Sequence, residues 1–142
     1  MLREMLFDKT NLPMIKNSLD AAMLRSRTVA NNIANVNTPG YRRVEVSFEK
    51  ELREALDRTK LQGERTDRRH LKLGRLDLSD VNGKAYKPVD PTLPSGVNNV
   101  DIDTEMAKLA EAQILYNYGI KFGQGVFKKM NAAIKGQSLP IQ

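Results

Sequence analysis

Apolar and small residues recur at alternating intervals of three and four near both ends of the chain. This heptad spacing places them on one side of an α-helix, where they form a seam against a neighbouring helix. The first such stretch follows Asn11, a favourable N-cap, has Pro13 close to its first helical position, and runs to Asn35. We predict a long helix over it, with a seam of Leu12, Ile15, Leu19, Ala22, Ser26, Val29, Ile33 and Val36.

A second long helix is predicted after Asp101, because acidic residues favour the positive end of the helix dipole. Its seam is Ile102, Met106, Leu109, Gln113, Tyr116, Ile120, Gly123, Phe127, Met130 and Ile134. Another stripe follows the same rhythm at Ala112, Leu115, Gly119, Phe122, Val126 and Ala133. A helix with two apolar stripes requires neighbours on two sides.

The length of this second helix limits how it packs. From Asp101 to Ile134 it would span about 50 Å at 1.5 Å per residue, whereas a compact globule of 142 residues is roughly 37 Å across. We therefore expect the helix either to break near Gly119, Gly123 or Gly125, or to protrude and be buried by other molecules.

The chain divides by pattern into an amino-terminal helix and turn (1–43), a loop-rich, partly disordered middle (44–99) and a carboxy-terminal coiled-coil-like helix (100–142). The middle is rich in Gly and Pro. It offers one short amphipathic stretch around Phe48, Leu52 and Leu56, and one hint of strand alternation in LKLGRLDL. The predicted fold is mainly α, a helical hairpin of two seamed helices.

The composition gives no indication of a catalytic or metal site. Only 6% of residues are aromatic and there is no cysteine, so neither an aromatic-lined pocket nor a thiolate site is expected. His70 stands without partners at ligand spacing, which predicts no catalytic, metal or cofactor role. We assign Asp101, Asp103 and Glu105 to complementing the helix dipole. The longest early apolar run, Met5 to Phe7, is too short for a cleaved secretion signal, so none is expected.

The most specific stretch is ANNIANVNTPGYRR, Ala30 to Arg43, where the first helix ends. Thr38-Pro39-Gly40-Tyr41 has the residues of a type II turn, in which proline sets one φ and glycine accepts a positive one. Asn35 and Asn37 are residues that tolerate the left-handed conformation at a helix end. Asn32 and Asn35 also place polar amides beside the seam, where a simple coiled coil would carry Lys or Glu.

This stretch resembles the amino-terminal signature of the bacterial flagellar axial proteins, the rod and hook group. VNNVDIDTEMAKLAEAQILYNYGIKFGQGVFKKMNAAIKG is similar to the carboxy-terminal signature of proximal rod members of that group. With TDRRHLKLG between them, the resemblance covers most of the chain. The absence of a large domain between the helices sets it apart from the longer hook and distal-rod proteins.

The resemblance implies a structural subunit of the periplasmic rod of the flagellar basal body, which connects the MS ring to the distal rod and transmits torque. It implies export by the flagellar type III apparatus. The partners that it implies are further copies of the chain, the rod proteins FlgC and FlgF, the adapter FliE and the MS-ring protein FliF. It implies no enzymatic activity, cofactor, nucleic acid or small molecule.

Within this hypothesis two sets of residues carry function. The turn motif is Asn32, Asn35, Thr38, Pro39, Gly40 and Tyr41. The assembly seam is Leu12, Ile15, Leu19, Val29, Ile33, Met106, Leu109, Tyr116, Ile120, Phe127, Met130 and Ile134.

Two other classes of function stay open. The net charge is +6, and residues 1–43 hold seven Lys and Arg against three Asp and Glu. A basic coiled-coil protein that binds nucleic acid would use this region and the cluster from Arg65 to Arg75, and its affinity would fall steeply with salt. An enzyme would need a pocket of which the sequence gives no sign.

Overall fold

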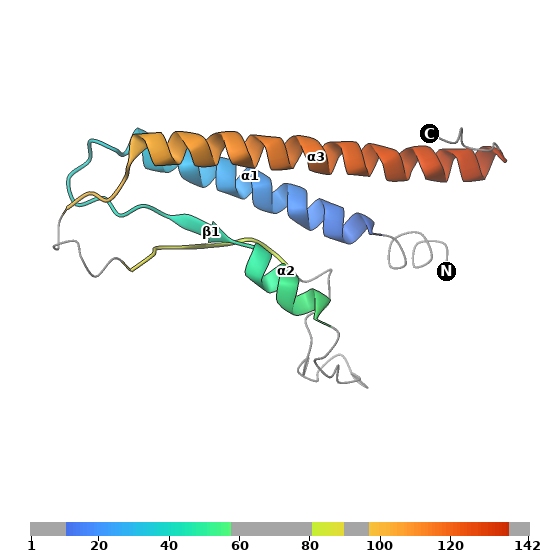
Figure 1. Ribbon diagram of the computed structural model, residues 1–142, viewed down its shortest axis with the longest axis horizontal. Coiled ribbons are helices and arrows are strands. Elements are labelled where there is room, and N and C mark those ends of the chain that lie inside the picture. The colour runs from blue at the N-terminus through green and yellow to red at the C-terminus, as the bar shows by residue number, and fades with distance from the viewer. Residues whose placement is uncertain (1–10, 58–80, 90–96, 137–142) are drawn as a thin grey trace.

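The computed structural model describes residues 11–57, 81–89 and 97–136. Two long helices, α1 (Leu12–Ala34) and α3 (Ile102–Lys135), run antiparallel side by side, and a small unit of β1 (Glu45–Ser47), α2 (Glu49–Leu56) and β2 (Lys84–Tyr86) lies on one side of them (Figure 1). The predicted mainly helical fold, with its long terminal helices packed together, is confirmed.

The ends of α1 and α3 follow from local signals. Asn11 and Asp101 are the N-cap residues, and Pro13 stands in the first turn of α1. The Asp101 side chain accepts a hydrogen bond from the Asp103 backbone N–H, whereas Asn11 makes no side-chain cap bond. Gly136 ends α3 with a φ of 63°, a left-handed value that glycine adopts without a steric penalty.

The long helix does not break; it protrudes, whereas its burial by other molecules stays a prediction. α3 is continuous through Gly119, Gly123 and Gly125, and at 34 residues it measures about 51 Å. It extends past the amino-terminal end of α1 (Figure 1). Gly119 and Gly123 do not break the helix because they face α1, against Leu19 and Ile15 respectively.

The middle segment contains more structure than the sequence predicts. β1 and β2 pair antiparallel, with Glu45 opposite Tyr86 and Ser47 opposite Lys84. The description of residues 44–99 as loop-rich missed both strands, since three residues are too few for a period of two to stand out. The LKLGRLDL stretch lies outside the described residues.

The small apolar core lies between α1 and α2. Ala21, Phe48, Ala55 and Val81 are buried together, with Leu52 packed against them. The amphipathic stretch is confirmed as α2, but Phe48 caps the helix and Leu56 is half-exposed. This core attaches one end of the two-stranded β1–β2 sheet to α1. This antiparallel strand pair is called the β1–β2 hairpin below, although α2 lies between its strands in sequence.

Candidate assembly interface

Asn32 is the centre of a buried polar junction at the end of α1. Its side chain has no exposed surface and makes four hydrogen bonds. Its Nδ2 donates to the Val44 carbonyl and to Glu105 Oε2, each at 2.8 Å. Its Oδ1 accepts from the Val44 N–H and from the Tyr41 hydroxyl, each at 3.0 Å. Because an amide offers two donors and two lone pairs, Asn32 is saturated and joins α1, the returning chain and α3.

The turn after α1 has the predicted hydrogen bond and glycine geometry. The Tyr41 N–H donates to the Thr38 carbonyl at 3.3 Å, and Gly40 has a φ of 71°. The asparagines do not use the left-handed conformation that they tolerate: Asn35 has a φ of −104°, and no described residue other than glycine has a positive φ. Asn35 instead donates from its side chain to the Asn31 carbonyl and accepts from the Thr38 hydroxyl.

The segment before α3 holds this turn from the other side. Asn98 Nδ2 lies within hydrogen-bonding distance of the carbonyls of Asn35, Val36 and Thr38, at 2.8, 2.8 and 3.0 Å. Asn99 Oδ1 accepts from the Arg43 N–H at 2.8 Å. Sequence reasoning missed both asparagines. The signal was their adjacency immediately before a helix, since asparagine side chains bond readily to backbone groups of turns.

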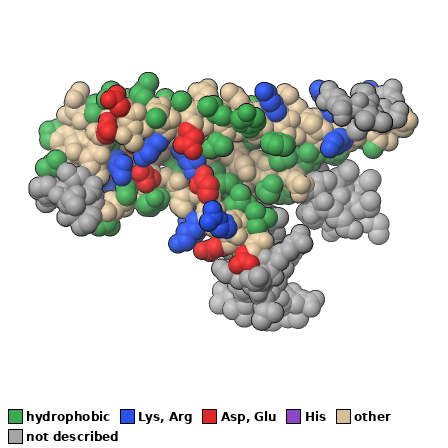
Figure 2. All heavy atoms as spheres, in the orientation of Figure 1, with side chains coloured by type: hydrophobic (Ala, Val, Ile, Leu, Met, Phe, Trp, Pro, Cys, Tyr) green, Lys and Arg blue, Asp and Glu red, His purple; other side chains and the backbone are tan. Residues whose placement is uncertain are grey.

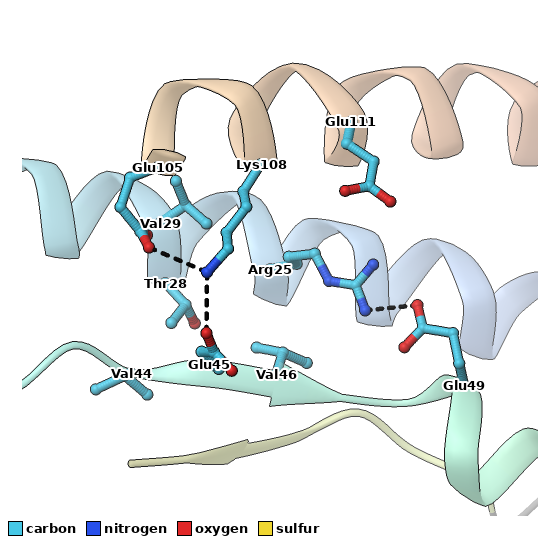
Figure 3. Close-up of a pocket in the computed structure, with 10 residues that line it drawn as sticks. All are labelled: Arg25, Thr28, Val29, Val44, Glu45, Val46, Glu49, Glu105, Lys108 and Glu111. Carbon is cyan, nitrogen blue, oxygen red and sulfur yellow. Dashed lines mark hydrogen bonds and ion pairs between the residues drawn. The ribbon is translucent and has the colours of Figure 1, made fainter. Parts of the chain in front are cut away.

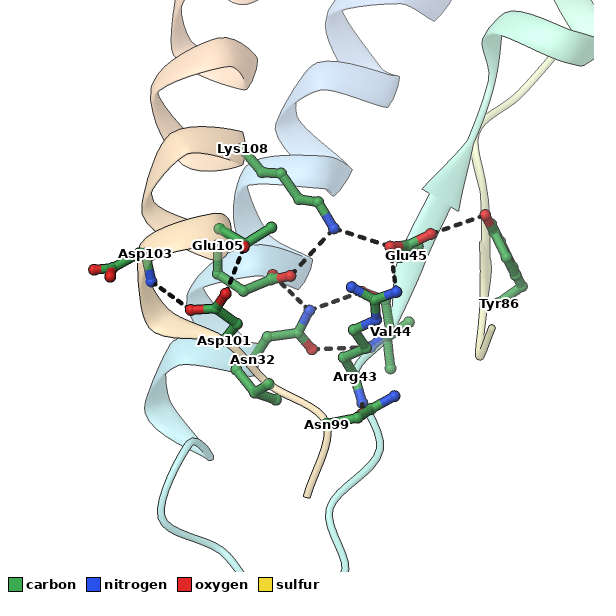
Figure 4. A network of polar contacts seen from close by, with 12 residues as sticks. Asn32, Arg43, Val44, Glu45, Tyr86, Asn99, Asp101, Asp103, Glu105 and Lys108 are labelled. Carbon is green, nitrogen blue, oxygen red and sulfur yellow. Dashed lines mark hydrogen bonds and ion pairs between the residues drawn. The ribbon is translucent and has the colours of Figure 1, made fainter. Parts of the chain in front are cut away.

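Glu105 is the second buried member of the junction, at 1% exposure. Besides accepting from Asn32, it accepts from Lys108 Nζ at 3.3 Å, and Lys108 reaches on to Glu45 at 2.9 Å (Figure 4). Glu45 also accepts from the Tyr86 hydroxyl at 3.0 Å and lies 3.5 Å from Arg43. Glu105 lies in the first turn of α3, as its assignment to the helix dipole requires, but its carboxylate is also buried against Asn32 and Lys108, which the sequence did not predict.

The ionisation of this network follows from its contacts. The hydrogen bond from Lys108 lowers the pKa of Glu45 despite its partial burial. Burial alone would lower the pKa of Lys108, but the bond to Glu45 and the charge of Glu105 outweigh it and raise that pKa. The bond to Glu45 raises the pKa of the Tyr86 hydroxyl. The ion pair is thus stable at neutral pH.

The face of α3 that meets α1 lies between the two predicted stripes. Ala112 and Gly123 are buried there, as is Glu105. Of the predicted seam residues, Val29 is buried. Leu12, Ile15, Leu19, Ile33, Leu109, Tyr116, Ile120 and Met130 are partly buried. Met106, Phe127 and Ile134 are 53%, 55% and 78% exposed. Because this face contains only some members of each stripe, the other members of both stripes are not covered by α1.

Two apolar grooves result, each bordered by α1 and α3. One has a volume of about 680 Å³ and is lined by Ile15, Ala22, Phe48, Leu115 and Phe122, among others. The other, of about 490 Å³, includes Leu12, Leu19, Met23, Tyr116 and Phe127. Figure 2 shows hydrophobic side chains exposed along α3 beside a cluster of acidic and basic ones.

Across the described ranges, no group of three or more His, Cys, Asp or Glu side chains is placed to hold a metal ion. No helix in that part of the chain is long and apolar enough to cross a membrane. His70 and the cluster from Arg65 to Arg75 fall in the range 58–80, outside the described residues.

The nucleic-acid hypothesis gains no support from the structure. Three cations of the amino-terminal third that the structure describes are paired with or close to carboxylates. Lys16 pairs with Asp20, Arg25 with Glu49, and Arg43 lies close to Glu45.

Comparison with known proteins defines the class first. Residues 18–42 match the family model described as flagella basal body rod protein. The match covers most of α1 and the turn, including Asn32 and Gly40.

Similarity over the whole chain then defines the family. The FlgB flagellar basal body rod protein of Bacillus subtilis is 33% identical over 125 residues, covering 86% of this chain and 91% of the relative. FlgB of Borreliella burgdorferi is 34% identical, covering 82% and 90%, and FlgB of Borrelia hermsii is 36% identical, covering 82% and 90%. The chain belongs to the FlgB family of flagellar basal body rod proteins. It is a structural subunit of the basal body rod and associates with other basal body components; the family is not enzymatic.

Proposed function

We propose that this subunit forms the proximal part of the rod, between the MS ring and the distal rod, and polymerises through its terminal helices. The observation that carries the proposal is the uncovered apolar surface of α3. Phe122, Phe127 and Ile134 are each more than half exposed, beside two apolar grooves. Burying apolar surface yields about 25 cal/mol per Å², so neighbouring helices in a lattice would be stabilised there.

The same packing provides for torque transmission. A rod must carry a twisting load without chemistry, and a continuous helix of about 51 Å bound to its neighbours along its length resists shear through many small contacts. Self-association on non-identical surfaces generates an open helical assembly where the rotation between neighbours does not close into a ring. We place the assembled subunit in the periplasm, after export through the flagellar type III apparatus.

The proposed partners are copies of the chain, FlgC and FlgF in the rod, the adapter FliE and the MS-ring protein FliF. Cross-linking mass spectrometry on purified basal bodies tests this directly. We expect cross-links from the exposed Lys121, Lys128 and Lys129 to a second copy and to components next to the MS ring. Cross-links to hook or distal-rod proteins alone would place the subunit elsewhere. Absence of the chain from basal bodies would overturn the proposal as a whole.

A further inference from the structure

The β1–β2 hairpin is attached to the helix pair at two separate points. At the Ser47 end the attachment is apolar, through Phe48 and Val81 against Ala21. At the Glu45 end it is polar, through Asn32 bonded to Val44 and Lys108 bonded to Glu45. β2 is exposed along its whole length and touches the network through the Tyr86 hydroxyl.

Between the two points β1 lies against α1, and its residues are partly buried, but a gap separates it from α3. A cavity of about 280 Å³ lies in this gap, lined by Val29, Val46 and Glu111, among others (Figure 3). Since packed side chains are what normally prevent one element from tilting on another, the side of β1 that faces α3 has less of that support. Across this gap, β1 is joined to α3 by hydrogen bonds and ion pairs.

Glu105 and Lys108 are one helical turn apart on α3 and form the bridge across this gap. Glu105 contacts Asn32 of α1 with one oxygen and Lys108 with the other. Lys108 extends over the cavity to Glu45 of β1, as Figures 3 and 4 show. A charge at 1% exposure without a partner is costly, so Glu105 restricts Lys108 to positions that keep it paired.

We propose that Glu105 and Lys108 are positioning residues that set the orientation of the β1–β2 hairpin relative to the helix pair. The bridge joins three elements separated by up to 73 residues in sequence. The raised pKa of Lys108 and the lowered pKa of Glu45 agree with a pair held in this geometry. The consequence for assembly rests on the proposed function, but the positioning itself does not.

The chain contains no cysteine, so pairs of spin labels can be introduced without removing native thiols. Labels at Lys87→Cys, next to β2, and Ala110→Cys, on α3, report the orientation of the hairpin in the purified full chain. A second pair, Arg27→Cys and Asn117→Cys, reports the spacing of α1 and α3. Double electron–electron resonance spectroscopy gives the distance distribution for each pair of labels.

Lys108→Met keeps the apolar stem and removes the ammonium group. We expect the distance distribution between the labels at positions 87 and 110 to become about twofold wider or more, because only the polar attachment is lost. The distance distribution of the α1–α3 label pair and the helical circular dichroism should stay unchanged. Glu105→Gln should broaden it less, since a glutamine can still accept from Asn32. The matched control is Glu111→Gln, one turn further along, which lines the cavity but makes no hydrogen bond or ion pair with a described residue.

Three results would overturn the inference. The hairpin distribution could be as narrow in Lys108→Met as in the parent, it could be broad already in the parent, or it could widen equally in Glu111→Gln. Parallel widening of the α1–α3 pair would indicate general unfolding instead of lost positioning. A swimming assay of the same variants then measures whether the rod needs a fixed hairpin, independently of whether the parent is found in basal bodies.

Discussion

Individual residues in this protein matter where they impose a conformation that the rest of the chain follows. Gly40 has a φ of 71° in the turn that leads from α1 to β1. Side chains with a Cβ adopt this region with strain, and β-branched ones with the most. The direction in which the chain leaves α1 therefore depends on a residue that has no side chain of its own.

Replacing Gly40 tests this dependence. Gly40→Val should lower the free energy of unfolding by about 1–3 kcal/mol, and Gly40→Ala by about 1 kcal/mol, because of the positive φ. Arg42→Lys, two residues on, should leave it nearly unchanged. Urea unfolding measures the differences, and swimming should fall in the order Val, Ala, Lys. Full motility of all three variants would show that the turn has no part in assembly.

Glu45 makes stability depend on pH at the other end of the junction. Its folded-state pKa is lowered, first by the hydrogen bond from Lys108 and also by Tyr86 and Arg43. A lowered folded pKa means that Glu45 stabilises the fold above its unfolded pKa, about 4.3, and that this contribution disappears as the pH falls through the folded value. Glu105 faces the same Lys108 from α3.

We therefore expect the parent to lose more stability than Glu45→Gln when the pH falls from about 6 to about 3. Urea titrations at several pH values give the two curves, which should converge at the acid end. Parallel curves across this range would mean that Glu45 ionises alike in the folded and unfolded chain.

At the scale of elements, the close approach of α1 and α3 depends on glycines in the middle of a helix. A Cβ on Gly119 would lie 2.8 Å from Leu19 Cδ2, whereas one on Gly125 would meet nothing within 4 Å. Glycine weakens a helix by roughly 0.5–1 kcal/mol relative to alanine, so only a packing requirement favours it at position 119.

These two positions should respond oppositely. Gly125→Ala should stabilise the protein by about 0.5–1 kcal/mol through helix propensity. Gly119→Val should destabilise it by about 1–3 kcal/mol, because the larger side chain separates the helices or displaces Leu19. Thermal unfolding followed by circular dichroism measures both. Stabilisation by Gly119→Val would contradict the close packing at Leu19.

At the scale of the whole molecule, the structure separates residues that hold the subunit together from residues available to its neighbours. Leu109 and Phe127 belong to the same predicted seam, and from sequence both should respond alike to a charge. Leu109 is partly buried, whereas Phe127 is 55% exposed and borders a groove. The two positions now have different expected effects.

Leu109→Asp should destabilise the isolated subunit by several kcal/mol, since it places a charge in a partly buried position. Phe127→Asp should change the subunit's unfolding free energy by less than about 1 kcal/mol and still prevent its incorporation into basal bodies. Urea unfolding combined with basal-body purification distinguishes the two effects, and Glu111→Gln serves as control. Normal motility with Phe127→Asp would show that the groove bordered by Phe127 is not part of the proposed interface.

The sequence by itself determined the helices and the turn. Pro13, Asp101 and the Pro39-Gly40 pair act within a few residues of their own position, so their effect can be read locally. The resemblance in the Ala30–Arg43 stretch likewise predicted the rod family that the comparisons establish. Heptad spacing identified apolar stripes, because helical periodicity is also a local property.

Only the tertiary structure decided which face of α3 meets α1 and what the polar residues do. Asn32 and Glu105 are 73 residues apart and Asn98 and Asn35 are 63 apart, and no local preference brings such groups together. Glu105 in sequence is an acidic residue in a first helical turn, where the dipole is a sufficient explanation. Its burial follows from the register of two helices, in which Gly119 and Gly123 lie against α1, and from the return of the chain at Val44.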